Sequence, residues 1–339
     1  MRYLLKIFPV LLTLLLIVSC GDGHYSVRTK GPALDVEILR LERDLFETGP
    51  ATLSGMKDSL MNKYGSFLQL FAWVINAGNL SDSAAWDSLQ EFATGRYNYG
   101  VFNTVMEKYP EMSAYEEDFE KAWARYRYYF PDSVIPAMYT FISGFNNSII
   151  VGDSVLGMGL DRYLGPGSKY YTELGIYNYL SLTMVPEKIV PDAFYAWAKA
   201  GWPYGDDSSN DDLLSEMLYE GKLHYFSKCM LYDYPDSLLF GFTSGQMKFC
   251  NNNEYRMWEY LIEHNMLFST DLMIIRKFTG EAPFTTYFTS ESPGRAAVWL
   301  GFRIVESYMK NNPGVELHQL MQDDDYRKIL EQAKYSPGR

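Results

Sequence analysis

The residues whose types and spacing suit chemistry lie close together in one segment, residues 211–226. Successive side chains of an α-helix are about 100° apart, so Glu220 and His224 fall on the apolar side of this segment and Glu216 lies at its edge. A carboxylate and an imidazole are therefore expected to point inward. Because an ionised carboxylate is costly to bury without a hydrogen-bonded partner or a metal ion, Glu220 requires one of the two.

Two kinds of partner would satisfy Glu220. In one family of zinc peptidases, a Glu-Gly helix supplies the third zinc ligand after an H-E-x-x-H helix has supplied two histidines and the general base. Gly221 follows Glu220 here, as that pattern requires. In the alternative, Glu220 accepts hydrogen bonds from a buried tyrosine, arginine or backbone group and orients two helices.

The positions of the histidines argue against an H-E-x-x-H site. Such a site needs two histidines four residues apart, because that spacing directs both imidazoles at one metal ion. No two histidines of the chain have this spacing, and they are His24, His224, His264 and His318. The predicted helix that precedes Glu220, residues 192–199, offers neither a histidine nor a glutamate. Glu220 thus keeps the position of a third ligand without the other two.

Other catalytic arrangements are not supported either. Glu216, Glu220 and His224 span about 12 Å along one helix, too far for all three to reach a single zinc ion. The chain contains no G-x-S-x-G sequence. For Asp161 and Arg162, roles in a turn and an ion pair are favoured over catalysis. We therefore predict no catalytic residue, no bound metal and no cofactor.

The elements that must position these side chains are mainly helical. Apolar and aromatic residues recur at steps of three and four from residue 53 to residue 130 and again after residue 190. Short β-rich stretches separated by Gly, Asn and Asp lie between these regions, at 137–142, 148–151 and 155–160. They predict a small antiparallel sheet with a hairpin turn at Gly152 and Asp153. An alternating stretch, residues 35–42, predicts an edge strand. The predicted fold class is α+β, predominantly helical.

A second positional signal is Gly301, which lies within a strongly patterned helix. Glycine in a helix interior is destabilising by up to about 1 kcal/mol relative to alanine, so its presence indicates close approach of another backbone. Cys229 and Cys250 are the cysteines of the predicted body. A disulfide between them and two buried free thiols are both compatible with the sequence.

The N-terminus has the pattern of a lipoprotein signal peptide. Arg2 and Lys6 precede a short apolar run that ends in Ser19 and Cys20. A cysteine directly after a small residue is the acylation site of bacterial lipoproteins, and several acyl chains on one residue give stable anchoring. The alternative is an ordinary secreted protein with an unmodified cysteine. The predicted organisation is a signal peptide at 1–19, a lipidated N-terminus and tether at 20–33, and a single domain at 34–339.

Composition restricts the partners of this domain. The chain has 339 residues, 47% of them hydrophobic, and a net charge of −12. Nucleic acid is excluded as a partner, because phosphate binding needs clustered Lys and Arg. An aromatic content of 16% suggests stacking platforms for sugars, although the helical spacing of these residues favours core packing. After the N-terminal run, no stretch has the length of a transmembrane helix.

Three stretches together resemble the GldB family of gliding-motility lipoproteins. They are residues 36–46, 151–165 and 292–309, and with Cys20 in front they extend over nearly all of the mature chain. That family is in turn similar to predicted zinc peptidases with H-E-x-x-H and Glu-Gly helices. The resemblance implies a bacterial envelope lipoprotein with its body in the periplasm or at the cell surface. It also implies partners among the envelope proteins of the gliding and type IX secretion machinery.

Residues and resemblance together predict a zincin-like body, about residues 131–339, that has lost catalysis, and a helical part at about 53–130. Its expected role is a non-catalytic scaffold or binding subunit. A vestigial cleft is expected between the Glu220 helix and residues 287–299, where Arg295 either clamps a peptide carboxylate or pairs with Glu220. The residues predicted for this cleft are Glu216, Glu220, His224, Tyr287, Arg295 and Trp299. The alternatives are an active metallopeptidase with unorthodox ligands and a glycan-binding surface lipoprotein.

Overall fold

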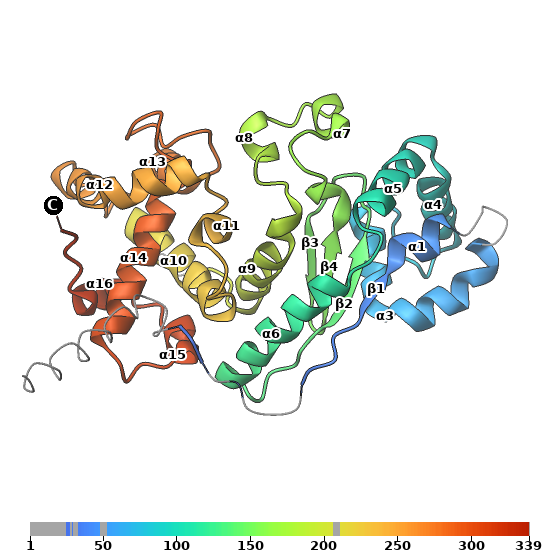
Figure 1. Cartoon of the computed structure of the whole chain (residues 1–339), viewed down its shortest axis with the longest axis horizontal. Coiled ribbons are helices and arrows are strands. Elements are labelled where there is room, and N and C mark those ends of the chain that lie inside the picture. The colour runs from blue at the N-terminus through green and yellow to red at the C-terminus, as the bar shows by residue number, and fades with distance from the viewer. Residues whose placement is uncertain (1–24, 28, 30–32, 48–52, 206–210, 339) are drawn as a thin grey trace, which may run out of the picture.

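The computed structural model describes residues 25–338 apart from 28, 30–32, 48–52 and 206–210. The architecture is α+β and predominantly helical, which confirms the predicted fold class (Figure 1). The sheet and the N-terminal helices lie to one side of the molecule and the C-terminal helices to the other, with α9 between them. The predicted signal peptide and the predicted acylation site, Cys20, lie outside the described residues.

The sheet is mixed rather than antiparallel, which corrects the prediction. Its strand order is β1-β2-β4-β3, and the strands are β1 (Ile38–Arg40), β2 (Ala137–Phe141), β3 (Ile149–Gly152) and β4 (Val155–Gly159). The pairs β1–β2 and β2–β4 are parallel, and only β3–β4 is antiparallel. Turn residues in the sequence indicate hairpins, but parallel neighbours are joined by long crossovers that leave no local signal.

Of the two further predictions for the sheet, the edge strand is correct and the hairpin turn is displaced by one residue. The N-terminal edge strand is confirmed, since β1 is an outer strand of the sheet. The hairpin turn lies one residue later than predicted, because Gly152 still pairs with Val155 and the turn residues are Asp153 and Ser154.

Helices cover both faces of the sheet. On one face, α3 (Lys57–Val74) places Phe67 flat against Tyr139 of β2, with ring centroids 4.2 Å apart. On the other face, the Trp123 indole of α6 (Ser113–Tyr129) donates to the Met138 sulfur. α9 (Ile189–Gly201) packs beside α6. Neighbouring residues of a strand point to opposite faces, so Met138 and Tyr139 carry the two layers.

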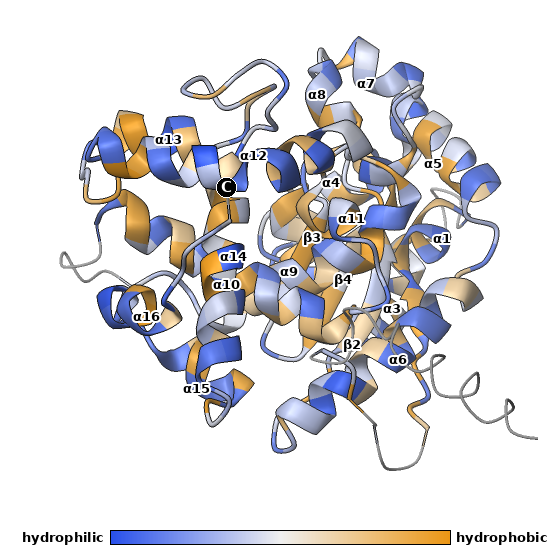
Figure 2. Ribbon diagram, turned by 60° about the vertical axis from the view of Figure 1, so that its left-hand side comes forward, coloured by the Kyte–Doolittle hydropathy of each residue, from blue (hydrophilic) through white to orange (hydrophobic). Residues whose placement is uncertain are grey.

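The remaining helices surround this core. Those on the sheet side are α1 (Leu41–Phe46), η2 (Ser54–Met56), α4 (Ser83–Thr94), α5 (Arg96–Lys108), η3 (Leu160–Tyr163), α7 (Lys169–Glu173), α8 (Asn178–Ser181) and η4 (Pro186–Lys188). Those in the C-terminal half are α10 (Leu213–Met230), α11 (Asp236–Phe240), α12 (Ser244–Glu263), α13 (Leu272–Thr279), α14 (Ala296–Asn311), α15 (Leu317–Gln322) and α16 (Tyr326–Ala333). Figure 2 shows hydrophobic residues gathered on the central strands and on inward faces of the helices.

The centre of the C-terminal half is α10, in which every residue except Glu216 is buried. α14 crosses it at a glycine pair, and a Cβ atom added to Gly301 would lie 1.8 Å from the Met217 carbonyl oxygen. A Cβ atom added to Gly221 would lie 2.4 Å from the carbonyl carbon of Gly301. The prediction that Gly301 marks a close backbone approach is therefore confirmed.

The ordered body extends further towards the N-terminus than residue 34. Tyr25, within the stretch predicted as a tether, is 6% exposed, and its hydroxyl donates to Glu306 of α14. Its ring also packs against Tyr225 of α10. Cys229 and Cys250 are buried free thiols.

Candidate functional site

Glu220 points inward, as predicted, and both of its carboxylate oxygens have partners. The residue is 5% exposed. Tyr195 of α9 donates its hydroxyl to Oε2 at 2.6 Å, and Lys199 of α9 donates its ammonium to Oε1 at 3.1 Å. Arg295 donates from Nη2 to Oε2 at 3.3 Å. Glu220 thus joins α9, α10 and the start of α14, as the structural alternative for this residue requires.

The two partners from α9 have a specific spacing. Tyr195 and Lys199 are four residues apart, so their side chains lie on one face of the helix, which is the face towards Glu220. Two metal-binding histidines on one helix would need this same spacing, and Ala196 stands where the general base would follow the first of them. The sequence showed only that histidines were missing from this helix. The tyrosine and lysine at i and i+4 are the sequence signal for the partners of Glu220.

Arg295 is held between two acidic groups. Its Nη1 donates to Glu281 at 2.9 Å, while Nη2 contacts Glu220. Burial lowers the pKa of the guanidinium, but the Glu220 carboxylate outweighs this effect and the pKa is raised above its usual value. The pairing of Arg295 with Glu220 is therefore the arrangement found. The backbone of Arg295 adopts a left-handed conformation, with φ at 60°, where it caps α14.

His224 is buried without a hydrogen-bond partner. It is 3% exposed, and within the described part of the chain neither ring nitrogen has a partner. Its ring stacks on Phe240 at 4.3 Å and also contacts Tyr195 at 5.2 Å, both between ring centroids. Burial, and then the positive charge of Arg295, lowers the pKa of His224 well below its usual value. The imidazole is therefore neutral, with one donor and one acceptor unused.

The other predicted cleft residues lie elsewhere or play smaller parts. Glu216 is half-buried one turn before Glu220, and burial and then the Glu220 charge raise its pKa. Tyr287 stacks on Phe278, with centroids 4.8 Å apart, and Trp299 is 2% exposed in the core. Neither of these aromatic residues lines the cavity next to His224.

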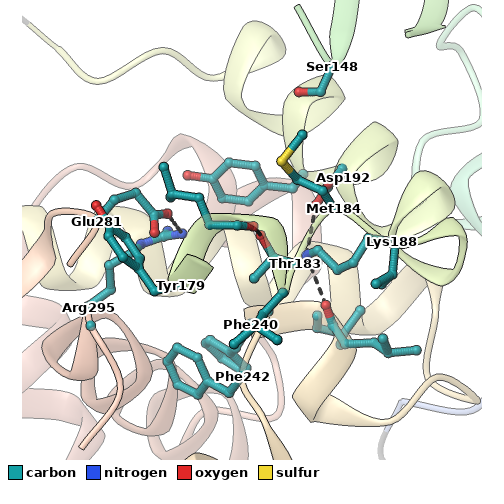
Figure 3. Close-up of a pocket in the computed structure, with 18 of the residues that line it drawn as sticks. Ser148, Tyr179, Thr183, Met184, Lys188, Asp192, Phe240, Phe242, Glu281 and Arg295 are labelled. Carbon is teal, nitrogen blue, oxygen red and sulfur yellow. Dashed lines mark hydrogen bonds and ion pairs between the residues drawn. The ribbon is translucent and has the colours of Figure 1, made fainter. Parts of the chain in front are cut away.

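That cavity has a volume of about 670 Å³ and lies between the sheet side and the C-terminal helices. Of the region where a cleft was expected, between α10 and residues 287–299, this cavity includes His224 and residues 293–295. Figure 3 shows Ser148 on one side and Phe240 and Phe242 on the opposite side, with Lys188 bonded to Asp192 between them. The segments that line it are 146–149, 162–163, 179–180, 182–185, 237–243, 281–283 and 293–295, together with Lys188 and residues of α9, α10 and α12.

The loop at the sheet side of the cavity is fixed by Asp161. Its Oδ2 accepts hydrogen bonds from the backbone N–H groups of Ser143 at 3.1 Å and Phe145 at 2.6 Å. Burial raises the pKa of Asp161 to about 6. The predicted turn role of Asp161 agrees with this geometry.

Arg162 lines the cavity but does not form the predicted ion pair. Its Nη1 donates to the carbonyl oxygen of Phe145 at 3.3 Å. Within the described ranges, no carboxylate lies within ion-pair distance of its guanidinium, and its buried Nε has no partner. Among the described residues Arg162 thus forms no salt bridge, although its charge acts on the buried Asp161 carboxylate and partly offsets the rise in pKa that burial causes there.

Comparison with known proteins identifies the family. A family model described as gliding motility protein GldB matches residues 24–337, nearly the whole chain. The chain belongs to the GldB family. No curated protein and no solved structure matches it. The likeness to zinc peptidases therefore stays a prediction.

Membership in the GldB family assigns the chain to the gliding-motility-associated lipoproteins. Of the stretches that resemble this family, residues 36–46 form β1 and α1, residues 151–165 include β4 and η3, and residues 292–309 form most of α14. The last two contribute Arg162 and Arg295 to the cavity. Two of the segments that form the cavity wall therefore lie within the stretches that resemble the GldB family.

Two further properties of this GldB family member concern metal ions and membranes. Among the residues that the structure describes, no group of three or more His, Cys, Asp and Glu side chains is arranged to hold a metal ion. No helix in the same part of the chain combines the length and the apolar character needed to cross a bilayer.

Proposed function

We propose that this GldB-family protein is a non-catalytic binding or scaffolding subunit of the cell envelope, held at a membrane by acyl chains on Cys20. Its partners are envelope proteins of the gliding-motility and type IX secretion machinery. Family membership supports the envelope location and the association with motility. The non-catalytic role is argued from Glu220 and its partners.

The observation that carries this role is the positive charge packed against Glu220. The Lys199 ammonium is 3.1 Å from one carboxylate oxygen and the Arg295 guanidinium is 3.3 Å from the other. A divalent metal ion bound to Glu220 would be repelled at close range by both cations. Tyr195 and Lys199 also occupy the i and i+4 positions from which two imidazoles would bind a metal. Glu220 is consequently a structural group rather than a ligand.

Metal content tests this proposal directly. Inductively coupled plasma mass spectrometry on the full-length protein, purified in detergent, is expected to find less than stoichiometric zinc, with or without prior zinc loading and buffer exchange. One tightly held zinc per chain would overturn the non-catalytic role. Lys199→His together with Tyr195→His and Arg295→Ala supplies the missing imidazoles, removes both cations and is the matched positive control for the assay.

Stability provides the second test. Glu220→Gln keeps the shape of the side chain but leaves Arg295 with only the exposed Glu281 as an acidic partner, which costs up to about 3 kcal/mol of unfolding free energy. Lys199 is half-exposed and contributes less. The expected result is a lower denaturation midpoint and no change in peptide cleavage, which stays at background in both proteins. An active hydrolase predicts the reverse, a loss of measurable cleavage with the midpoint retained.

A further inference from the structure

The outer edge of β3 has unused backbone hydrogen-bonding groups. The N–H of Gly159 in β4 donates to the carbonyl of Ser148, so the even-numbered residues of this segment pair with β4. The N–H and C=O groups of Ile149 and Val151 consequently face away from β4. In the part of the chain that the structure describes, none of these groups has a hydrogen-bond partner. Such an edge is a template for an additional strand.

This edge begins at the wall of the cavity. Ser148 and Ile149 both line it, and Figure 3 shows Ser148 facing the pocket. A chain that entered the cavity beside Ser148 would therefore lie against the free edge of β3. β3 spans four residues, Ile149–Gly152, or about 14 Å of extended chain.

Charge at one end of the edge sets a direction for the added chain. Arg162 reaches the carbonyl of Phe145, four residues before Ile149, so its guanidinium lies near the N-terminal end of β3. A strand added antiparallel to β3 ends there with its C-terminus. A terminal carboxylate would then find a partly buried arginine that forms no salt bridge among the described residues, which is the arrangement that favours a charge-assisted hydrogen bond.

The other cations of the cavity are already paired. Lys188 contacts Asp192 at 2.7 Å, and Arg295 contacts Glu281 at 2.9 Å as well as Glu220. Arg162 is therefore the lining cation, among the residues described, that has no salt bridge and is left to form one with a ligand.

His224 provides an independent sign of a missing ligand. It lines the same cavity, is only 3% exposed, and has two unpartnered nitrogens among the described residues. A neutral imidazole offers one donor and one acceptor, and a peptide group offers one of each. The cavity rim adds apolar contacts, because Leu182 lines the cavity and is 53% exposed. These features suit a peptide with apolar side chains at alternate positions.

We propose that the cavity binds the C-terminal segment of a partner polypeptide, which adds to the edge of β3 as an antiparallel strand and places its terminal carboxylate at Arg162. The proposal rests on the binding role put forward above and names the chemistry of the partner. It requires an extended segment with a free C-terminus, and it requires no covalent step.

Binding of synthetic peptides tests this proposal. The probe is a fluorescein-labelled heptapeptide of alternating Val and Thr with a free C-terminus, measured by fluorescence anisotropy with the detergent-solubilised full-length protein. Replacing the terminal carboxylate by an amide is expected to weaken binding about tenfold, the scale of one charge-assisted hydrogen bond. N-methylation of alternate peptide groups is expected to abolish binding, because it removes the donors that pair with β3. Equal binding by an amidated peptide with an internal Glu would overturn the assignment to a C-terminus.

Two protein variants test separately how the Arg162 charge and the β3 edge contribute to peptide binding. Arg162→Gln is expected to weaken binding of the free acid about tenfold and to leave binding of the amide unchanged, since only the free acid uses the charge. Val151→Pro removes one outward N–H and no bond to β4, so it is expected to weaken both peptides. Val151→Thr is its control, because it changes the side chain and keeps the N–H. Thermal melting of each variant shows whether the fold is retained.

Hydrogen exchange locates the bound peptide. With the free acid present, exchange of the Ile149 and Val151 amides is expected to slow, because both become hydrogen-bonded. Binding without this protection, equal affinity for acid and amide, or no binding at millimolar peptide would each overturn the proposal. Mass spectrometry of the same samples tests the proposed function independently. A cleaved peptide would contradict the non-catalytic role, whatever the affinity of the protein for that peptide.

Discussion

Buried charged side chains in this protein are mostly paired with specific partners. Glu42 is fully buried, but Arg40 lies 2.7 Å away and Thr140 donates to both of its oxygens. Lys222, which is 1% exposed, pairs with Asp324 at 3.1 Å and also donates to backbone carbonyls. Such pairs offset the cost of removing charge from water. The cavity residues Arg162 and His224, and Asp161 next to them, have buried polar atoms without hydrogen-bond partners among the described residues, so we expect pH and ligands to act there.

The pH dependence of stability should report on Asp161. Burial raises its pKa from 3.8 to about 6. The folded state therefore binds this proton more tightly than the unfolded state, and the resulting stability is fully present below pH 3.8 and lost as the pH rises through about 6. Asp161→Asn does not titrate, so its unfolding free energy relative to the wild type should rise between pH 4 and pH 7, by up to about 3 kcal/mol.

Urea denaturation of both proteins at the two pH values measures this difference. Asp153→Asn is the matched control, because Asp153 is exposed in the β3–β4 turn and has no buried charge to relieve. A difference in unfolding free energy between the wild type and Asp161→Asn that stays constant with pH would show that Asp161 titrates in the folded state as it does in the unfolded chain.

Replacing His224 should stabilise the fold while weakening ligand binding. His224→Phe removes two buried nitrogens that have no partner and keeps the contact with Phe240. We expect the unfolding free energy to rise by about 1 kcal/mol, since unpartnered buried polar groups are destabilising. His264→Phe is the control at an exposed position and should give no such gain. A loss of stability in His224→Phe would mean that the imidazole is already satisfied.

For single residues, the sequence predicted that the Glu220 side chain points inward, but it did not identify all of its hydrogen-bond partners. Helical periodicity requires Glu220 to face inward, whichever partner it has. The partners Tyr195 and Lys199 follow from how α9 packs against α10, which local spacing does not reveal. Their i and i+4 positions become informative only when the helix is examined for residues that replace a histidine pair.

Among the elements, the crossing of α10 and α14 is the least tolerant of added volume. Gly301→Ala would place a methyl group against the Met217 carbonyl oxygen, at 1.8 Å without relaxation. The helices must separate to admit it, and we expect a loss of about 3 kcal/mol of unfolding free energy despite the better helix propensity of alanine. The measurement is the urea midpoint of the purified variant.

A second glycine supplies the control for this prediction. Gly245 lies in the first turn of α12, and the nearest atom to an added Cβ would be 3.9 Å away. Gly245→Ala should therefore leave stability unchanged or raise it by up to about 1 kcal/mol. Similar losses in both variants would mean that backbone freedom, rather than the helix crossing, determines the effect.

Strand pairing shows what a single sequence leaves open at the element scale. The strands of the hairpin are adjacent in the chain, and their alternation and turn residues predicted both of them. β1 and β2 are separated by the helices α1 to α6, so their parallel pairing depends on how those helices fold back. Local patterns do not contain that information.

At the scale of the whole molecule, the cavity also shows that local sequence patterns do not determine which segments come together. Its wall combines segments between residue 146 and residue 295, and sequence reasoning that starts from one helix finds only His224 and Arg295 among them. The stretches that resemble the GldB family add one more wall segment, residues 162–163. The remaining segments come together only through the tertiary fold.

The proposed lipid anchor on Cys20 is separated from the folded body by only a few residues. Tyr25 is packed between α10 and α14, so only the five peptide units from Cys20 to Tyr25, at most about 18 Å, separate acyl chains on Cys20 from the folded body. The N-terminal described residues lie in the lower half of Figure 1, while the cavity-lining segment around α8 lies at the top. A lipid on Cys20 would accordingly hold the lower side of the molecule, as seen in Figure 1, next to the bilayer and direct the α8 side away from it.

Removing the acylation site should release the protein from the membrane. Cys20→Ala is expected to move the protein from the detergent phase to the aqueous phase in phase partitioning, because no helix in the described part of the chain is able to span a bilayer. Cys250→Ala removes a buried thiol and leaves Cys20 in place, so it controls for the loss of a cysteine and should partition as the wild type does. If Cys20→Ala stayed in the detergent phase, the attachment would have to come from a protein partner or from the N-terminal apolar run. Metabolic labelling with palmitate distinguishes these cases, since the label should appear in Cys250→Ala and be absent from Cys20→Ala.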